Sequence, residues 1–160
     1  MPCSMNHFEL YLGLGSNDIR KEYWIDRAIE LINSSLAMPY TALSDKIVNK
    51  AWGFDGPDFL NCVVRYDIPA AGQDPELHVR ALLCIFQDIE KQLGRTEKTT
   101  LGPDGRPVYH DRTIDIDILL YGDLHMVTPN LTIPHPQISQ RPFVLIPLRQ
   151  VLNNNKRYEY

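Results

Sequence analysis

The alternation of hydrophobic and polar positions predicts one strand, one helix and two further strands in the first half of the chain. Residues 8–14 are mostly apolar, are typical of a strand and end at a cluster of turn formers, residues 15–18. Apolar residues then recur at helical spacing over residues 19–36, which predicts a helix with one apolar face. Residues 41–49 and 59–68 have strand composition, and a loop rich in glycine and proline separates them.

The second half begins with a helix whose two ends are marked in the sequence. Asp74 and Pro75 are suited to the N-cap and the first helical position, and Gly94 is suited to the end of the helix. A polar segment, residues 95–112, predicts a long loop that leads into a strand over residues 113–121. The remaining chain contains five prolines, so we expect loops and short helices there.

The predicted order is strand, helix, strand, strand, helix, strand. This order is typical of an α+β fold, the ferredoxin-like βαββαβ sandwich, with an antiparallel sheet and both helices on one face. The chain has 160 residues, the size of one ordinary domain, and contains no internal repeat or linker. We therefore expect a single domain over residues 1–160, with long loops at its site and a short C-terminal extension.

Composition narrows the class of protein. Hydrophobic residues make up 44% of the chain and charged residues 22%, which excludes a disordered, collagen-like or coiled-coil protein. The net charge of -4 argues against a nucleic-acid-binding surface. Three cysteines without C-x-x-C spacing indicate neither a disulfide framework nor a zinc ribbon, and Cys62 and Cys84, in apolar segments, are expected in the core. Without an apolar leader or a membrane-length apolar stretch, we expect a cytoplasmic protein that binds no membrane. We also expect a monomer.

Residues 114–118, with the sequence Ile-Asp-Ile-Asp-Ile, hold the strongest chemical signal. Side chains alternate across a strand, so the isoleucines share one face and Asp115 and Asp117 share the other, about 7 Å apart. Two neighbouring carboxylates repel each other unless cations compensate, and oxygen ligands favour Mg²⁺ shared with phosphates. The strand alone is equally compatible with a solvated acidic face.

The loop before this strand carries an excess of positive charge in an acidic chain. It could bind a phosphate group, since arginine donates two hydrogen bonds to phosphate oxygens, or it could simply be solvated. Its surroundings contain five cations, Lys91, Arg95, Lys98, Arg106 and Arg112, against three anions, Glu97, Asp104 and Asp111.

Three further features are compatible with a nucleotide or heterocycle site, and each also has a structural explanation. Gln87 and Glu90 share one face of the second helix, which could border the site or form an ordinary surface. His135 stands between two prolines and could meet a phosphate or a base, or serve the loop alone. Asn61 lies in an apolar strand, where its amide either holds backbone or reads a flat heterocycle. Dinucleotide, Walker and nucleophile-elbow motifs are absent from the sequence.

Five blocks of the chain, in order, resemble the 6-hydroxymethyl-7,8-dihydropterin pyrophosphokinase family of folate biosynthesis. The Arg-x-x-Asp-x-Asp block is the most specific of the five, and the resemblance runs from about Phe8 to Val151. The blocks are Leu14–Asn17, Pro57–Asn61, Gln87–Arg95, Arg112–Leu119, and Ile133–His135 with Arg141–Phe143.

The resemblance implies that the diphosphate of ATP is transferred to the pterin hydroxymethyl group and that AMP is released. It implies two Mg²⁺ ions on Asp115 and Asp117, with Arg95 and Arg112 also catalytic. The ATP-binding residues it implies are Gln87, Glu90, Arg95, Lys98, Arg112, Ile118, His135 and Arg141. The pterin-binding residues it implies are Ala51, Trp52, Phe54, Phe59, Asn61, Tyr109 and Phe143.

This chain differs from the family pattern in the loop before the Asp-x-Asp strand. Relative to the family pattern, residues 99–107 have the character of an insertion. Tyr109 stands where a tryptophan is common in the family. Either Lys98 or Arg106 takes the place of the second loop cation. Two other classes remain open: a palm-like nucleotidyl transferase or cyclase, and a non-catalytic ligand-binding domain of the same topology.

Overall fold

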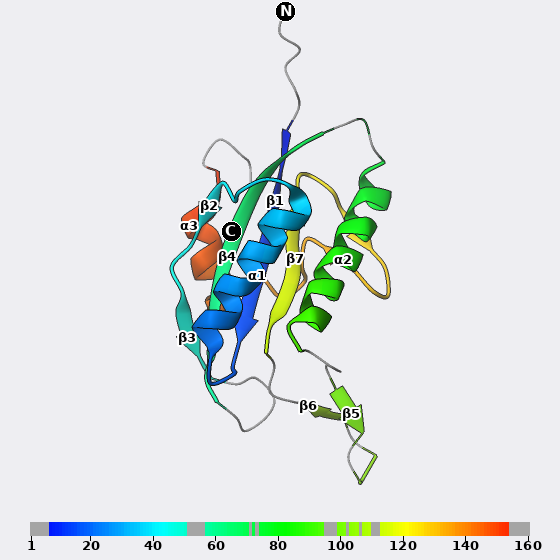
Figure 1. The fold of residues 1–160 in the computed structure, drawn as a ribbon. Coiled ribbons are helices and arrows are strands. Elements are labelled where there is room, and N and C mark those ends of the chain that lie inside the picture. The colour runs from blue at the N-terminus through cyan, green and yellow to red at the C-terminus, as the bar shows by residue number, and fades with distance from the viewer. Residues whose placement is uncertain are drawn as a thin grey trace, which may run out of the picture.

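An antiparallel sheet with helices on both faces forms the centre of the structure (Figure 1). The computed structural model describes residues 7–50, 57–70, 72, 74–94, 99–101, 103–105, 107–109 and 113–153. The helices are α1 (Lys21–Leu36), α2 (Pro75–Gln92) and α3 (Pro142–Val151). The strands are β1 (His7–Ser16), β2 (Ala42–Leu43), β3 (Ile47–Asn49), β4 (Phe59–Pro69), β5 (Thr99–Leu101), β6 (Pro107–Tyr109), β7 (Asp115–Tyr121), β8 (Met126–Val127) and β9 (Thr132–Ile133).

The sheet has the strand order β2-β4-β1-β7, and β3 also pairs with β4. Every pair in it is antiparallel, so the expected mixed α/β protein with an antiparallel sheet is confirmed. The first strand of the chain, β1, lies in the middle, between β4 and β7. Its register places Gly13 beside Asp117 and Gly15 beside Asp115. This register brings the two glycines next to the two carboxylates.

Helices α1 and α2 cover one face of the sheet and enclose the main core (Figure 1). Helix α1 buries an apolar stripe at helical spacing, and α2 buries a second one. The predicted ends of α2 are confirmed: the Asp74 carboxylate accepts a hydrogen bond from Glu76 N at 2.9 Å, and Pro75 occupies the first turn. Gly94 follows the helix with φ +91°, a backbone conformation that favours glycine.

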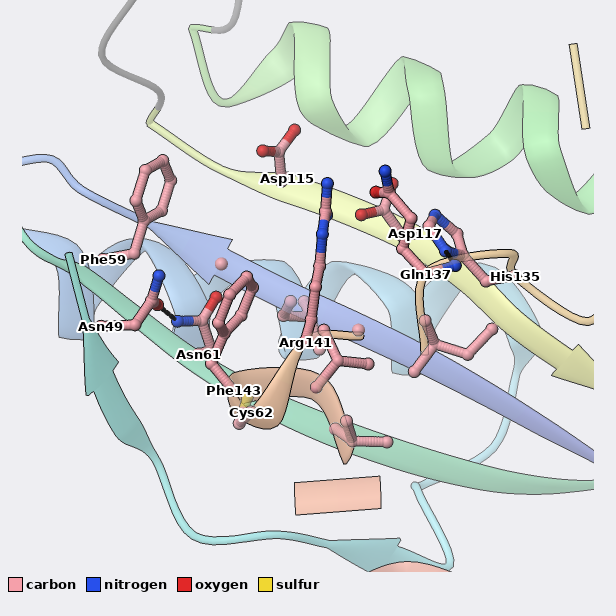
Figure 2. A pocket seen from close by; sticks show the side chains of 16 residues that line it. Asn49, Phe59, Asn61, Cys62, Asp115, Asp117, His135, Gln137, Arg141 and Phe143 are labelled. Atoms are coloured by element: carbon pink, nitrogen blue, oxygen red, sulfur yellow. Dashed lines mark hydrogen bonds between the residues drawn. The ribbon is translucent and has the colours of Figure 1, made fainter. Parts of the chain in front are cut away.

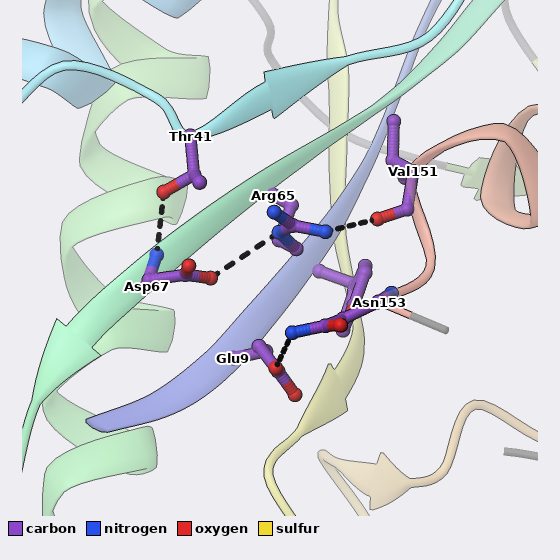
Figure 3. A network of polar contacts seen from close by, with 7 residues as sticks. Glu9, Thr41, Arg65, Asp67, Val151 and Asn153 are labelled. Atoms are coloured by element: carbon purple, nitrogen blue, oxygen red, sulfur yellow. Dashed lines mark hydrogen bonds and ion pairs between the residues drawn. The ribbon is translucent and has the colours of Figure 1, made fainter. Parts of the chain in front are cut away.

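Helix α3 packs on the opposite face, over a smaller apolar cluster. A polar network fastens its C-terminal end to the sheet (Figure 3). Arg65 Nη1 of β4 donates to the carbonyl oxygen of Val151 at 2.7 Å, and Arg65 Nε lies 3.2 Å from Asp67 Oδ1. Asn153 Nδ2 donates to Glu9 Oε1 of β1 at 3.0 Å. A cation at the last turn also matches the negative end of the helix dipole.

Four local expectations from the sequence differ from the structure. The first helix begins at Lys21, after an Ile19 side chain that is 96% exposed. Residues 41–49 form two short strands with a break that includes Ser44, whose hydroxyl accepts a hydrogen bond from Val63 N. Cys62 is buried as expected, but Cys84 is exposed, because it lies on the outer side of α2.

The remaining difference concerns the segment predicted to be a loop. Part of it, β5 and β6, forms an antiparallel two-stranded hairpin. Each of these strands has only three residues, which is too short to display an alternation of apolar and polar positions in the sequence.

In the C-terminal part, α3 spans 10 residues and follows a second short hairpin, β8–β9. Within the described ranges, no helix is both long and apolar enough to span a bilayer.

Candidate active site

A cavity of about 320 Å³ lies between the sheet and the start of α3, on the face opposite α1 and α2; we call it the central pocket. Figure 2 shows that it combines carboxylates, amides, aromatic rings, an imidazole and a guanidinium. Its polar and aromatic lining comprises Asn49, Phe59, Asn61, Asp115, Asp117, His135, Gln137, Arg141 and Phe143.

Asp115 and Asp117 lie on one face of β7, and both are half-buried. The alternation of the strand sends Ile114, Ile116 and Ile118 into the main core on the other face, as the sequence pattern predicts. The neighbouring positions of β1 are the glycines described above, which carry no side chain. Both carboxylates line the central pocket, where they can accept hydrogen bonds or bind a hard cation.

The beginning of α3 brings a cation and an aromatic ring to the same pocket. Arg141 is the N-cap residue of the helix, and Pro142 occupies its first turn. The Arg141 guanidinium lies 5.8 Å from the centroid of the Phe143 ring, within the range of a cation–π contact. Figure 2 shows Arg141 reaching from α3 toward β7, which carries the carboxylates. This end of the pocket can therefore contact both an anion and a flat ring.

Two amides form a pair on the wall made by β3 and β4. Asn61 Nδ2 donates a hydrogen bond to Asn49 Oδ1 (Figure 2). Asn61 Oδ1 occupies space next to β1: a Cβ placed on Gly15 would lie only 2.8 Å from it. The amide of Asn61 is therefore fixed from two sides in the pocket wall.

Neighbouring groups determine the protonation of two other side chains in the pocket lining, His135 and Cys62. His135 N donates to Leu119 O at 2.9 Å, which holds the loop after β9 against β7. His135 Nδ1 accepts from Gln137 N at 3.3 Å, so the neutral ring carries its proton on Nε2. Burial raises the pKa of the Cys62 thiol to about 12, so this residue of the pocket is not a thiolate nucleophile at neutral pH.

A second cavity, of about 280 Å³, adjoins the central pocket; we call it the side pocket. Asp117 and His135 line both cavities and so mark their junction. Glu90 of α2 lines the side pocket and is 5% exposed, and its Oε2 accepts from Ile116 N at 3.0 Å. Its carboxylate thus ties α2 to the outer edge of β7.

The structure brings most of the described candidate residues into these two cavities. Phe59, Asn61, Asp115, Phe143 and Arg141 line the central pocket, and Gln87, Glu90 and Ile118 line the side pocket.

Sequence reasoning missed Asn49, Gln137, Gly13 and Gly15 as pocket residues. Asn49 is the last residue of β3 and reaches the pocket because β3 pairs with β4. The sequence does not show this pairing, so it could not identify Asn49 as a pocket residue.

Other candidates fall outside what the structure describes. Tyr109 belongs to β6, and its side chain is not described. The remaining ones lie outside the described residues: Ala51, Trp52, Phe54, Arg95, Lys98, Arg106 and Arg112.

The metal-binding capacity of the site rests on carboxylate oxygens. Across the described part of the chain, no group of three or more His, Cys, Asp or Glu side chains could hold a metal ion by itself. Asp115 and Asp117 supply two hard oxygen ligands to the central pocket. That donor set fits a hard cation whose other ligands come from a bound phosphate or from water.

Known proteins that are similar in sequence show the family to which the chain belongs. Residues 11–153 match the family model of 7,8-dihydro-6-hydroxymethylpterin-pyrophosphokinase (HPPK). Two 2-amino-4-hydroxy-6-hydroxymethyldihydropteridine pyrophosphokinases are similar over most of their length. The protein from Porphyromonas gingivalis is 41% identical over 89% of this chain and 89% of its own. The protein from Aquifex aeolicus is 36% identical over 91% of this chain and 81% of its own.

A third relative is a larger protein. The mitochondrial folate synthesis bifunctional protein of Pisum sativum is 34% identical over 90% of this chain, which covers 25% of that protein. The chain belongs to the HPPK family, as the resemblance of its five blocks predicted. Family members are pyrophosphokinases, so the class of protein is an enzyme of folate synthesis.

Proposed function

We propose that this protein transfers the diphosphate of ATP to the hydroxymethyl group of 6-hydroxymethyl-7,8-dihydropterin, with Mg²⁺, to give AMP and the pterin diphosphate. The observation that carries the proposal is the position of the two carboxylates: both line a pocket with aromatic and amide walls, and Asp117 also lines the second pocket beside it. A heterocycle and a nucleotide bound in these cavities would meet at Asp115 and Asp117.

In the central pocket, the pterin would lie against two rings and one amide. Phe59 and Phe143 supply apolar aromatic surfaces, on which a flat heterocycle can pack. Asn61 would read the hydrogen-bonding edge of the pterin, because its amide oxygen faces β1 in the pocket wall. Among residues outside the described ranges, Ala51, Trp52 and Phe54, together with Tyr109, complete the proposed pterin side.

In the side pocket and at its junction, the ATP would meet polar groups from α2 and from the loop after β9. Gln87 and Glu90 border the cavity, and Ile118 contributes an apolar surface. His135, with its proton on Nε2, would donate a hydrogen bond to a phosphate oxygen. Arg141 would pair with phosphate charge, and Arg95, Lys98 and Arg112 are the proposed cations of the preceding loop.

Asp115 and Asp117 would hold the divalent ions. When bound, Mg²⁺ would neutralise phosphate charge and make the pterin hydroxyl a better nucleophile. The protein's own contribution is to keep two carboxylates side by side on a rigid strand, and to aim the reacting groups at each other. We further propose a ferredoxin-like fold, a single domain over residues 1–160, and a cytoplasmic monomer.

Product analysis tests this proposal directly. Purified protein with ATP, Mg²⁺ and the hydroxymethyl dihydropterin should form AMP and pterin diphosphate in equal amounts. ADP as the main product would indicate single phosphoryl transfer instead. Release of pyrophosphate would indicate a palm-like nucleotidyl transferase or cyclase. Absence of any Mg²⁺-dependent nucleotide affinity in calorimetry would indicate a non-catalytic binding domain.

The variant Asp117→Ala tests the role of the carboxylate pair. We expect turnover to fall by at least about a thousandfold, since charge stabilisation at the reacting centre is lost. The fold should be retained, because the substitution removes one of two half-buried carboxylates that repel each other. Asp123→Ala, an exposed position after the same strand, is the matched control and should keep normal turnover. Near-normal turnover of a folded Asp117→Ala protein would remove the metal-binding role of this residue.

A further inference from the structure

We infer that Asn49 is a positioning residue that sets the orientation of the Asn61 amide and thereby the affinity of the central pocket for a flat lactam heterocycle. This inference rests on the proposed function, because it concerns how the same pocket recognises its pterin. Asn49 is the last residue of β3 and is half-buried in the wall of the central pocket.

The backbone carbonyl of Lys50 sets the orientation of the Asn49 amide. A carbonyl oxygen can only accept hydrogen bonds, and Asn49 Nδ2 donates to it at 2.8 Å. The amide nitrogen of Asn49 is thereby directed to the backbone, and its oxygen is left as the acceptor for the next group. That group is Asn61 Nδ2, which donates to Asn49 Oδ1.

Asn49 in turn decides which end of the Asn61 amide faces β3. An asparagine amide has nearly the same shape in its two flipped orientations, so its neighbours decide which atom faces a ligand. The acceptor on Asn49 selects the orientation with nitrogen toward β3. The oxygen then faces the opposite way, where Gly15 leaves room for it: a Cβ at that position would be 2.8 Å away.

The remaining hydrogen-bonding groups of Asn61 determine which ligand edge the pocket can bind. Its oxygen and its second N–H stay available to the central pocket, which offers an acceptor and a donor on one short group. A lactam edge carries the complementary donor and acceptor, as does the ring of a 2-amino-4-oxo pterin. If the Asn61 amide were flipped, its N–H would face the donor of the lactam edge and its oxygen would face the acceptor.

The sheet supports this role of Asn49. In the pairing of β3 with β4, Ile47 lies opposite Asn61 and Asn49 lies opposite Phe59. Asn49 and Asn61 are therefore diagonal neighbours on one face, within reach of a short side-chain pair. Val48, between them in the register, is 61% exposed and points away from the pocket.

Three variants separate positioning from simple stabilisation. Asn49→Leu keeps the shape of the side chain and removes both hydrogen-bonding groups. Asn49→Asp keeps an acceptor for Asn61 Nδ2, but it replaces the donor to the Lys50 carbonyl by a second carboxylate oxygen and adds one negative charge. Val48→Thr changes the exposed neighbour on the same strand and serves as the matched control. Each variant is examined as the full chain by denaturation, by calorimetry with pterin, and by calorimetry with a non-hydrolysable ATP analogue.

We expect the Kd for the pterin to rise about tenfold in Asn49→Leu, the size of one lost orienting interaction, with nucleotide affinity unchanged. Asn49→Asp should bind pterin within about threefold of the natural protein, as should Val48→Thr. Equal pterin affinity in folded Asn49→Leu and natural protein would overturn the inference. So would an equal loss in Asn49→Leu and Asn49→Asp. If the natural protein forms no AMP, the proposed function fails instead, so the two failures are distinguishable.

Discussion

Replacing Gly15 by alanine should disturb the pocket at one defined point. Gly15 lies in β1 beside Asp115, and its backbone has no positive φ, so alanine is compatible with the strand conformation. The added Cβ, however, would lie 2.8 Å from Asn61 Oδ1 and 3.8 Å from the carbonyl oxygen of Leu60. The first distance is too short for a carbon and an oxygen that are not bonded.

The size of the disturbance follows from these distances. Asn61 Oδ1 must retreat by about 0.6 Å to reach 3.4 Å, where ordinary contact begins. Its side chain is short and its nitrogen is bonded to Asn49, so the shift has to be shared by the amide and the backbone. Overpacking of this kind costs about 1–3 kcal/mol, and the lower entropy of the unfolded alanine chain offsets about 0.4–1 kcal/mol. We expect a net loss of about 1–2 kcal/mol in the free energy of unfolding.

Gly13→Ala provides the matched comparison on the same strand and face. Its Cβ would lie 3.5 Å from the Leu119 methyl carbons, an ordinary van der Waals contact. The free energy of unfolding should therefore stay equal or rise by about 0.4–1 kcal/mol. Urea denaturation of both variants measures this difference.

Ligand binding gives the second measurement. In Gly15→Ala the amide of Asn61 is displaced, so we expect pterin affinity to fall about ten- to hundredfold, with nucleotide affinity retained. Calorimetry on the folded variant measures both affinities. Natural stability together with natural pterin affinity would refute the reasoning, because it would show that Asn61 does not occupy the space above Gly15.

Two further predictions concern residues away from the pocket. Arg65→Met removes a partly buried, charge-assisted hydrogen bond to α3 and the ion pair with Asp67, so the free energy of unfolding should fall by about 1.5–3 kcal/mol, measured in urea. A loss below about 0.5 kcal/mol would contradict the anchoring role. Burial lowers the pKa of His78, whose Nδ1 lies 2.6 Å from the Tyr121 hydroxyl, so the unfolded chain binds more protons than the folded one near pH 6. Stability should therefore be complete above the ordinary pKa of histidine and fall as the pH drops below it; a urea midpoint for His78→Gln with the same pH slope as the natural protein would contradict this assignment.

The sequence predicts best the features that depend on neighbours along the chain. The Asp74–Pro75 start and the Gly94 end of α2 are local chemistry, and both lie where expected. The Ile-Asp alternation of β7 also needs only the period of a strand, and it places Asp115 and Asp117 on one face. These elements required no knowledge of the rest of the fold.

Features that depend on distant partners were not predictable in this way. Asn49 reaches the pocket because β3 pairs with β4, and Gly15 matters because β1 brings it against Asn61. Ser44 interrupts the second predicted strand through a hydrogen bond with Val63, on another strand. In each of these cases the deciding contact joins segments that are far apart along the chain. Cys84 is different: its outward position follows from the helical period of α2, which composition alone does not use.

The central place of β1 determines when the sheet can be completed during synthesis. This strand is synthesised before both of the segments that pair with its edges, residues 59–69 and 115–121. Until the later segment emerges, one edge of β1 exposes unpaired backbone N–H and C=O groups, which can join a strand of another molecule. Nascent chains in which residues 115–121 have not yet emerged should therefore need protection from aggregation.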